Sequence, residues 1–158
     1  MIKLCRVDHR LLHGQVAFSW TNELSADCIL IANDAVVNDE VFKTTMKLAK
    51  PSGVKLVIKN LEDSIKAINS GVTDKYRLLV VVKTIHDANV LSAGCQAIQS
   101  INLGGTIRKD GYRQISKAIF ISDEDETELK ELQQRGVSVF IQQLPAESSL
   151  PLEHVLHW

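Results

Sequence analysis

Short apolar runs alternate with amphipathic segments along the whole chain, and this alternation constrains the fold more than any other feature. Several runs are apolar at consecutive positions, which is typical of strands covered on both faces. The expected strands lie at 2–7, 28–32, 54–58, 77–82, 100–103, 117–121 and 137–142. The expected helices lie at 14–24, 38–49, 61–69, 86–93 and 123–134. This order predicts an α/β fold with a mostly parallel central sheet of about seven strands, flanked by helices on both faces.

Capping residues support the expected helix starts. Asn38 and Asn60 each precede a helical segment and are good N-caps, and Ser122 is followed by acidic residues that favour a first helical turn. No internal repeat or linker divides the chain, so we expect one domain over residues 1–158. The tail PAESSLPLEHVLHW is interrupted by proline and is expected to pack loosely.

Charge and cysteine content narrow the functional classes. The formal net charge is −1, which provides no long-range attraction for nucleic acid or for an anionic membrane. The N-terminus has no signal-peptide pattern, and no apolar run approaches the roughly 20 residues of a membrane span. Cys5, Cys28 and Cys95 form no C-x-x-C pair, and neither a metal-ligand cluster nor a nucleotide-phosphate motif is present. We therefore expect a cytoplasmic protein with buried free thiols and no metal or cofactor.

The stretch RVDHRLLHGQV, residues 6–16, concentrates ionisable side chains where the first expected strand gives way to a helix. In open α/β sheets, ligands bind at the carboxyl ends of the strands, where this loop lies. His13 is expected at the first turn of the helix, where unpaired N–H groups bind anions. Arg10 can grip two phosphate oxygens in a fork. Asp8 could accept a hydrogen bond from one ring nitrogen of His13 and so expose the other.

Together these residues describe a phosphorylatable histidine, because phosphoryl transfer needs mainly positioning and charge neutralisation. Gly14 lets the backbone approach the phosphate, and we expect Gly14 and Gln15 to contribute to phosphate binding. The alternative for His13 is a structural histidine in a turn. His9 is expected to be exposed or structural, and Trp20 is expected in the core rather than as a platform for a sugar ring. The remaining histidines, His86, His154 and His157, are expected to be structural.

A second loop is dense in charge. The segment LGGTIRKDGYRQIS, residues 103–116, carries Arg108, Lys109 and Arg113. These cations either add donors to the same anion site or form a basic rim on which a partner docks. The alternative is a solvated, irregular hairpin, since the two glycines lack the Gly-Lys-Ser/Thr pattern of a P-loop.

The stretch RVDHRLLHGQV, residues 6–16, resembles the phosphorylation-site motif of the enzyme IIB component of the mannose/fructose/sorbose family of bacterial sugar phosphotransferase systems. That motif runs approximately Arg-x-Asp-x-Arg-Leu-x-His-Gly-Gln-Val, and this sequence matches every fixed position. Position 9 is His where members more often carry Asp or Asn, and residues 106–107 are Thr-Ile where a Met-His pair is common. Later segments resemble the family in the same order, namely ILIANDAVVND (29–39), INLGG (101–105), GYRQISKAIFIS (111–122) and RGVSVFIQQLP (135–145).

The resemblance implies a largely parallel α/β fold and a phosphocarrier. His13 would accept phosphate from phosphorylated enzyme IIA and give it to a sugar delivered by the membrane enzyme IIC/IID permease, while Arg10 grips the phosphate. The protein would then be cytoplasmic and peripherally associated with that permease. Two alternatives remain open. One is a histidine phosphatase, although Leu12 stands where such enzymes carry arginine, and the other is a non-catalytic α/β ligand-binding module.

Overall fold

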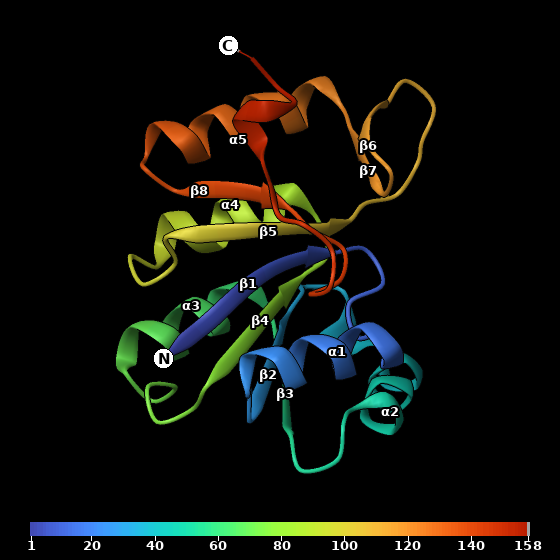
Figure 1. The fold of residues 1–158 in the computed structure, drawn as a ribbon. Helices are drawn as coiled ribbons and strands as arrows, with labels where there is room; N and C mark the ends of the chain where they lie inside the picture. The colour runs from blue at the N-terminus through green and yellow to red at the C-terminus, as the bar shows by residue number, and fades with distance from the viewer. Residues whose placement is uncertain (158) are drawn as a thin grey trace.

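A seven-stranded sheet in the order β3-β2-β4-β1-β5-β8-β9 forms the centre of the computed structural model, which describes residues 1–157 (Figure 1). All neighbouring strands are parallel except β8 and β9, so the predicted mostly parallel sheet is confirmed. The strands are β1 (Ile2–Asp8), β2 (Cys28–Ala32), β3 (Lys55–Lys59), β4 (Leu78–Val82), β5 (Ser100–Gly105), β8 (Ser138–Ile141) and β9 (Leu150–Pro151).

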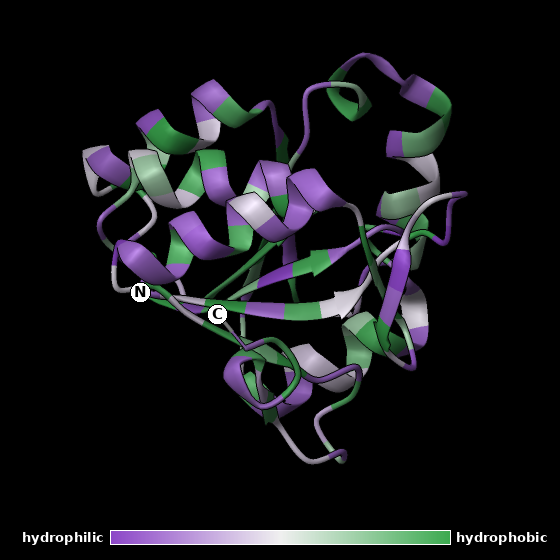
Figure 2. Ribbon diagram, turned by 90° about the horizontal axis from the view of Figure 1, so that it is seen from above, coloured by the Kyte–Doolittle hydropathy of each residue, from purple (hydrophilic) through white to green (hydrophobic). Residues whose placement is uncertain are grey.

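Helices cover both faces of this sheet, as Figure 2 shows. One face is packed by α1 (Gly14–Leu24) and α2 (Glu40–Ala49). The other face is packed by α3 (Leu61–Ser70), α4 (Ile85–Gly94) and α5 (Asp123–Gln134). The chain runs outward from β1 to β3 and then returns across β4 to β5. Because crossovers between parallel strands are right-handed, reversing the direction moves the helices to the opposite face.

The central strands are apolar at consecutive positions because each face has its own core. Along β2, Cys28 and Leu30 contact the core under α3, α4 and α5, whereas Ile29 and Ile31 contact the core under α1 and α2. Trp20 is buried in the second core, as predicted. The three cysteines are free and buried, also as predicted, and burial, with a smaller contribution from Cys95, raises the pKa of the Cys5 thiol to about 12.

The helix starts agree with the predicted N-caps at two of three positions. Asn60 accepts a hydrogen bond from the backbone of Asp63 at 2.7 Å, and Ser122 forms a reciprocal capping box with Asp125. The prediction for Asn38 is wrong, because Asn38 ends a short 3₁₀ turn, η1 (Val36–Asn38). The N-cap of α2 is instead Asp39, whose carboxylate accepts from the backbone of Phe42 at 3.0 Å.

Two segments near the C-terminal half differ from expectation. The strand expected at 117–121 lies outside the central sheet and forms β7 (Ile119–Ile121), which pairs antiparallel with β6 (Arg113–Ser116) in a hairpin. The seventh strand of the sheet is β9, which comes from the tail predicted to pack loosely, so that prediction is wrong. Leu152, in the 3₁₀ turn η2 (Leu152–His154), is fully buried and anchors the tail. Pro151 lacks an N–H donor and is therefore tolerated in this edge strand.

Candidate functional site

The loop after β1, residues 9–13, is named here the His13 loop, and it leaves the middle of the sheet between β4 and β5. Leu11 has a φ of 59°, a left-handed conformation that is uncommon for leucine. The backbone N–H of Leu11 donates to the carbonyl of Asp8 at 2.9 Å. Leu11 and Leu12 are both buried in the core under α1. The loop is therefore held from below by apolar packing, and its polar side chains face outward.

His13 is the N-cap of α1, which agrees closely with the predicted helix start. Its side chain is exposed and makes no capping hydrogen bond, and no acceptor or donor contacts the ring within residues 1–157. The first helical N–H with a backbone partner is that of Ala17, which donates to the His13 carbonyl at 2.8 Å. The N–H groups of Gly14, Gln15 and Val16 have no acceptor in the described part of the chain. A free imidazole thus stands beside an unfilled helix N-terminus, a place that favours an anion.

Gly14 is not required by the packing of the protein itself. A Cβ atom built on Gly14 would meet no heavy atom within 4 Å. The backbone of Gly14 is therefore open to approach from solvent, and the phosphate contact at this residue stays a prediction. Gln15, the next residue, is likewise exposed on the first turn of α1.

Arg10 is tethered at one side and free at the other. Its Nε lies 3.4 Å from Asp8 Oδ1, and its backbone N–H donates to the same oxygen at 3.0 Å. The two Nη groups find no acceptor among residues 1–157, and the side chain is 34% exposed. The predicted fork is therefore available to an anion on the outer side of the His13 loop.

Asp8 does not contact His13, so the hydrogen bond expected between their side chains is absent from the described residues. Asp8 is buried at the end of β1 and points toward Arg6, whose Nη2 donates to Asp8 Oδ2 at 3.2 Å. Residues two apart in a strand lie on the same side, which explains this pairing. With Arg6 on one carboxylate oxygen and Arg10 on the other, Asp8 positions Arg10 and does not orient the imidazole of His13.

Arg6 is a residue beneath the site that the sequence analysis did not single out. It is 1% exposed, and its guanidinium donates to the side chain of Asn102 at 2.7 Å and to the carbonyls of Gln142 and Gln143 at 3.1 and 3.0 Å. Burial lowers the pKa of Arg6, and the neighbouring Asp8 opposes this effect. The sequence carries one signal for this buried pair, because Arg6 lies inside an apolar strand, two residues before Asp8.

Gly104 makes room for the buried Arg6. A Cβ atom on Gly104 would lie 2.1 Å from Arg6 Cζ, far inside van der Waals contact. The guanidinium also lies over the Trp20 ring, with Cζ 5.4 Å from the ring centroid. Trp20 also donates from Nε1 to the Gln143 carbonyl at 3.0 Å. Arg6 thus ties β1, β5, α1 and the segment after β8 together beneath the His13 loop.

The second dense stretch forms an exposed loop over residues 106–112, named here the hairpin loop, which leads into β6 and β7. Arg108 and Lys109 are exposed and lie near the Phe120 and Tyr112 rings, at 6.0 and 5.8 Å from the ring centroids. Arg113 pairs with Asp123 at 2.9 Å and with Glu126 at 2.7 Å, so its charge ties the hairpin to α5. Two of the three predicted rim cations, Arg108 and Lys109, therefore have no carboxylate partner among residues 1–157.

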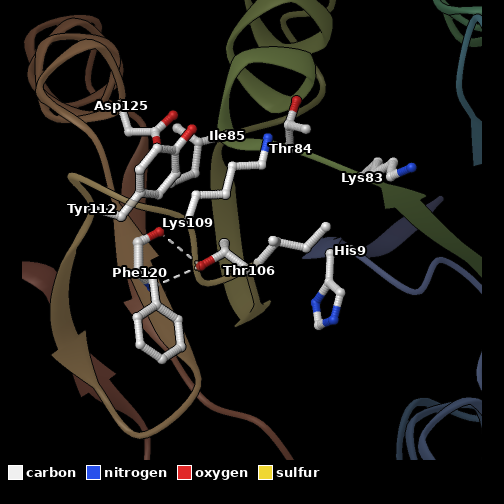
Figure 3. A pocket seen from close by; sticks show the side chains of 10 residues that line it. His9, Lys83, Thr84, Ile85, Thr106, Lys109, Tyr112, Phe120 and Asp125 are labelled. Carbon is white, nitrogen blue, oxygen red and sulfur yellow. Dashed lines mark hydrogen bonds between the residues drawn. The ribbon is translucent and has the colours of Figure 1, made fainter.

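A cleft of about 180 Å³ separates the hairpin loop from the first turn of α4. Figure 3 shows Lys109 reaching across it toward Thr84, with His9 at the edge. His9 is half-buried, and its backbone N–H donates to the Gly105 carbonyl at 3.0 Å. The cleft brings the His13 loop and the hairpin loop to one edge of the sheet through His9. His13 itself does not line this cleft.

The part of the chain that the structure describes contains no group of three or more His, Cys, Asp or Glu side chains placed to hold a metal ion. Over the same residues, no helix is long and apolar enough to cross a membrane. His86, one of the histidines predicted to be structural, hydrogen-bonds Glu128 across α4 and α5, far in sequence from the His13 loop. The His13 loop itself offers an imidazole, a guanidinium and backbone N–H groups.

Comparisons with known proteins agree on one family. Residues 2–158 match the family described as the PTS system sorbose subfamily IIB component, where PTS is the phosphotransferase system. A probable phosphotransferase enzyme IIB component of Streptococcus pyogenes is 34% identical, over 99% of this chain and 100% of that protein. The mannose-specific EIIAB component of Escherichia coli is 29% identical, over 96% of this chain and 47% of that longer protein.

The same family is found among solved structures. The crystal structure of the IIBSor domain of the sorbose permease from Klebsiella pneumoniae has a TM-score of 0.91 and 29% identity, with 96% of this chain and 93% of that chain covered. The sequence comparisons and the fold comparison thus both confirm the family that the resemblance predicted. The chain belongs to the sorbose subfamily of phosphotransferase system IIB components.

Proposed function

We propose that this protein is a phosphocarrier in which His13 accepts a phosphoryl group from phosphorylated enzyme IIA and passes it to a sugar. The observation that carries the proposal is the arrangement at the start of α1. An exposed imidazole without a partner stands beside three unpaired backbone N–H groups and the free fork of Arg10. Phosphoryl transfer requires such positioning and charge neutralisation more than it requires acid–base chemistry.

The first transfer moves phosphate between two nitrogens. The lone pair of a His13 ring nitrogen attacks phosphorus, an N–P bond forms, and the bond to the donor group breaks with its electron pair returning to the donor. In the second transfer, a sugar hydroxyl oxygen attacks phosphorus, the N–P bond to His13 breaks, and the hydroxyl proton passes to water. In both steps Arg10 and the N–H groups of Gly14 and Gln15 stabilise the charge on the phosphoryl oxygens, and Asp8 holds the backbone N–H of Arg10.

Two partners follow from this scheme. The donor is enzyme IIA, a pairing supported by the Escherichia coli relative whose name joins A and B components in one EIIAB protein. The acceptor is a sugar held by the membrane IIC/IID permease, which places the chain in the cytoplasm at the membrane surface. Because the same loop must meet both partners in turn, each complex is short-lived, and Arg108 and Lys109 provide charges for salt-sensitive docking. Arg113 supports this rim by holding the hairpin on α5.

One incubation tests the proposal against its alternatives. The protein is mixed with phosphorylated enzyme IIA, and the phosphate is followed in the protein and in solution. A phosphocarrier accumulates stoichiometric, acid-labile phosphate on the chain. Rapid release of inorganic phosphate would instead indicate a histidine phosphatase, and neither labelling nor release would indicate a non-catalytic binding module.

A further inference from the structure

Two buried nitrogen atoms next to Asp8 have no hydrogen-bond partner among the described residues. Within residues 1–157, the buried side-chain nitrogen and oxygen atoms that lack a partner are Arg6 Nε and His9 Nδ1. Both belong to neighbours of Asp8, which is 1% exposed. Buried polar atoms are nearly always hydrogen-bonded, so an unpaired nitrogen beside a carboxylate requires an explanation.

The two oxygens of Asp8 differ in how firmly they are held. Oδ2 accepts from the buried Arg6 at 3.2 Å, and that guanidinium is fixed by three further acceptors. Oδ1 accepts from the backbone N–H of Arg10 at 3.0 Å and from Arg10 Nε at 3.4 Å, which is long for such a bond. His9 Nδ1 lies 4.0 Å from the same Oδ1. Two side chains therefore compete for one carboxylate oxygen, and neither holds it tightly.

The phosphorylated state would resolve this competition. When Arg10 turns its guanidinium toward a phosphoryl group on His13, its Nε moves away from Asp8. A buried carboxylate that loses a donor is destabilised unless another donor replaces it. His9 is the neighbour able to do so, because its ring is 32% exposed at the edge of the cleft and its Nδ1 has no other partner. Figure 3 shows the His9 ring at the edge of the cleft.

We propose that His9 is a positioning residue for phosphoryl transfer. In the unphosphorylated protein, Arg10 Nε holds Asp8 Oδ1. In the phosphorylated protein, Arg10 binds the phosphoryl group and His9 Nδ1–H takes its place on Asp8. Asp8 keeps its donors in both states, so Arg10 is released at little cost. This inference rests on the proposed function and names the residue that lets Arg10 change partners.

Two substitutions at His9 and one spectrum test the inference. His9→Leu removes the donor, whereas His9→Asn keeps an N–H donor near the position of Nδ1. The phosphoryl transfer rate from phosphorylated enzyme IIA is measured for both variants, with His86→Leu as a control on a distant histidine. We expect His9→Leu to slow transfer on the order of tenfold, and His9→Asn and the control to keep the wild-type rate within about twofold. In the wild-type protein, the ¹⁵N resonance of His9 Nδ1 should change to that of a hydrogen-bonded N–H on phosphorylation.

The outcomes separate this inference from the proposed function. If the wild-type protein takes no phosphate on His13, both fail. If the wild-type protein is labelled on His13 and His9→Leu is labelled at the same rate, only the inference about His9 is overturned. An Nδ1 resonance that is unchanged by phosphorylation also overturns it, and this readout needs no variant to fold. Equal slowing in His9→Leu and His9→Asn would contradict an exchange of donors on Asp8.

Discussion

The His13 loop and the hairpin loop lie at the same edge of the sheet but are held in different ways. The His13 loop is fixed from below, by the buried Leu11 and Leu12 and by the Arg6–Asp8 pair. The hairpin loop lies on the surface, and its base is held by Thr106 and by the ion pairs of Arg113. Under the proposed function, the difference teaches that the reactive groups are mounted on the core, where small shifts are resisted, while the docking charges stand on a surface loop.

The largest effect should come from disturbing the support of the His13 loop at Gly104. Gly104→Ala places a Cβ 2.1 Å from Arg6 Cζ and must displace a buried ion pair, so we expect a loss of about 3 kcal/mol in unfolding free energy. The matched control is Gly105→Ala, whose Cβ would come no closer than 3.5 Å, to His9 Nδ1. That variant should lose less than about 1 kcal/mol. Urea denaturation measures both, and equal losses would show that Arg6 is not clamped against β5.

Arg10→Lys tests chemistry without disturbing that support. The lysine keeps the positive charge but cannot form a fork, so we expect phosphoryl transfer to slow about 10²-fold. The melting temperature should stay close to that of the wild type, because the Arg10 side chain is partly exposed and contributes one long contact to Asp8. Single-turnover labelling gives the rate. A wild-type rate would mean that the N–H groups at the start of α1 neutralise the phosphoryl group without Arg10.

The hairpin loop should affect association and leave chemistry intact. Reversing the charges of Arg108 and Lys109 to Glu should slow phosphate uptake from enzyme IIA about tenfold at low salt, through the association rate. Uptake from a small phosphodonor should be unchanged. The control reverses the charges of Lys47 and Lys50, which are exposed at the C-terminal end of α2. This helix leads into the edge strand β3, far along the sheet from the hairpin loop. If both double variants behave alike, the docking surface lies away from the hairpin loop.

The smallest effect concerns His86, a histidine outside both loops. Its hydrogen bond to Glu128 raises the pKa of His86 above the ordinary value of 6.5, with smaller contributions from Asp87 and Asp125. A raised pKa in the folded state stabilises the protein below that ordinary value, and the contribution is lost as the pH rises through the raised pKa. His86→Gln should remove this pH dependence. Because the His86 side chain is exposed, we expect less than about 1 kcal/mol, measured by denaturation at pH 6 and pH 9. An identical pH profile in the variant would contradict it.

Much of the fold follows from local sequence patterns. Helix α5 spans Asp123–Gln134 as predicted, because its capping residues act over only three positions, and α1 begins at Gly14 as predicted although its N-cap makes no side-chain hydrogen bond. The strand at 117–121 was placed in the central sheet, and the tail was predicted to pack loosely. Pairing of β7 with β6, and of β9 with β8, depends on contacts between distant segments, which a pattern of apolar residues does not determine.

In the site, too, local features could be predicted from the sequence and contacts between distant segments could not. His13, Arg10 and Gly14 could be proposed from the sequence because their chemistry is local to one turn. The role of Arg6 was missed because its partners, Asn102 and the carbonyls of Gln142 and Gln143, come from strands far away in the sequence. The partner expected for Asp8 was wrong for a related reason, since alternation along β1 turns Asp8 toward Arg6 and away from His13.

The central claim is that the phosphoryl group resides on His13, and mapping the phosphate on the intact protein tests it most directly. The wild-type chain and His13→Gln are each incubated with phosphorylated enzyme IIA, and the imidazole ¹⁵N resonances of the histidines are compared before and after. We predict one acid-labile phosphoramidate, on His13, in the wild-type chain, and no label in a folded His13→Gln variant. Phosphate on any other of the five histidines, or full labelling of His13→Gln, would contradict the account.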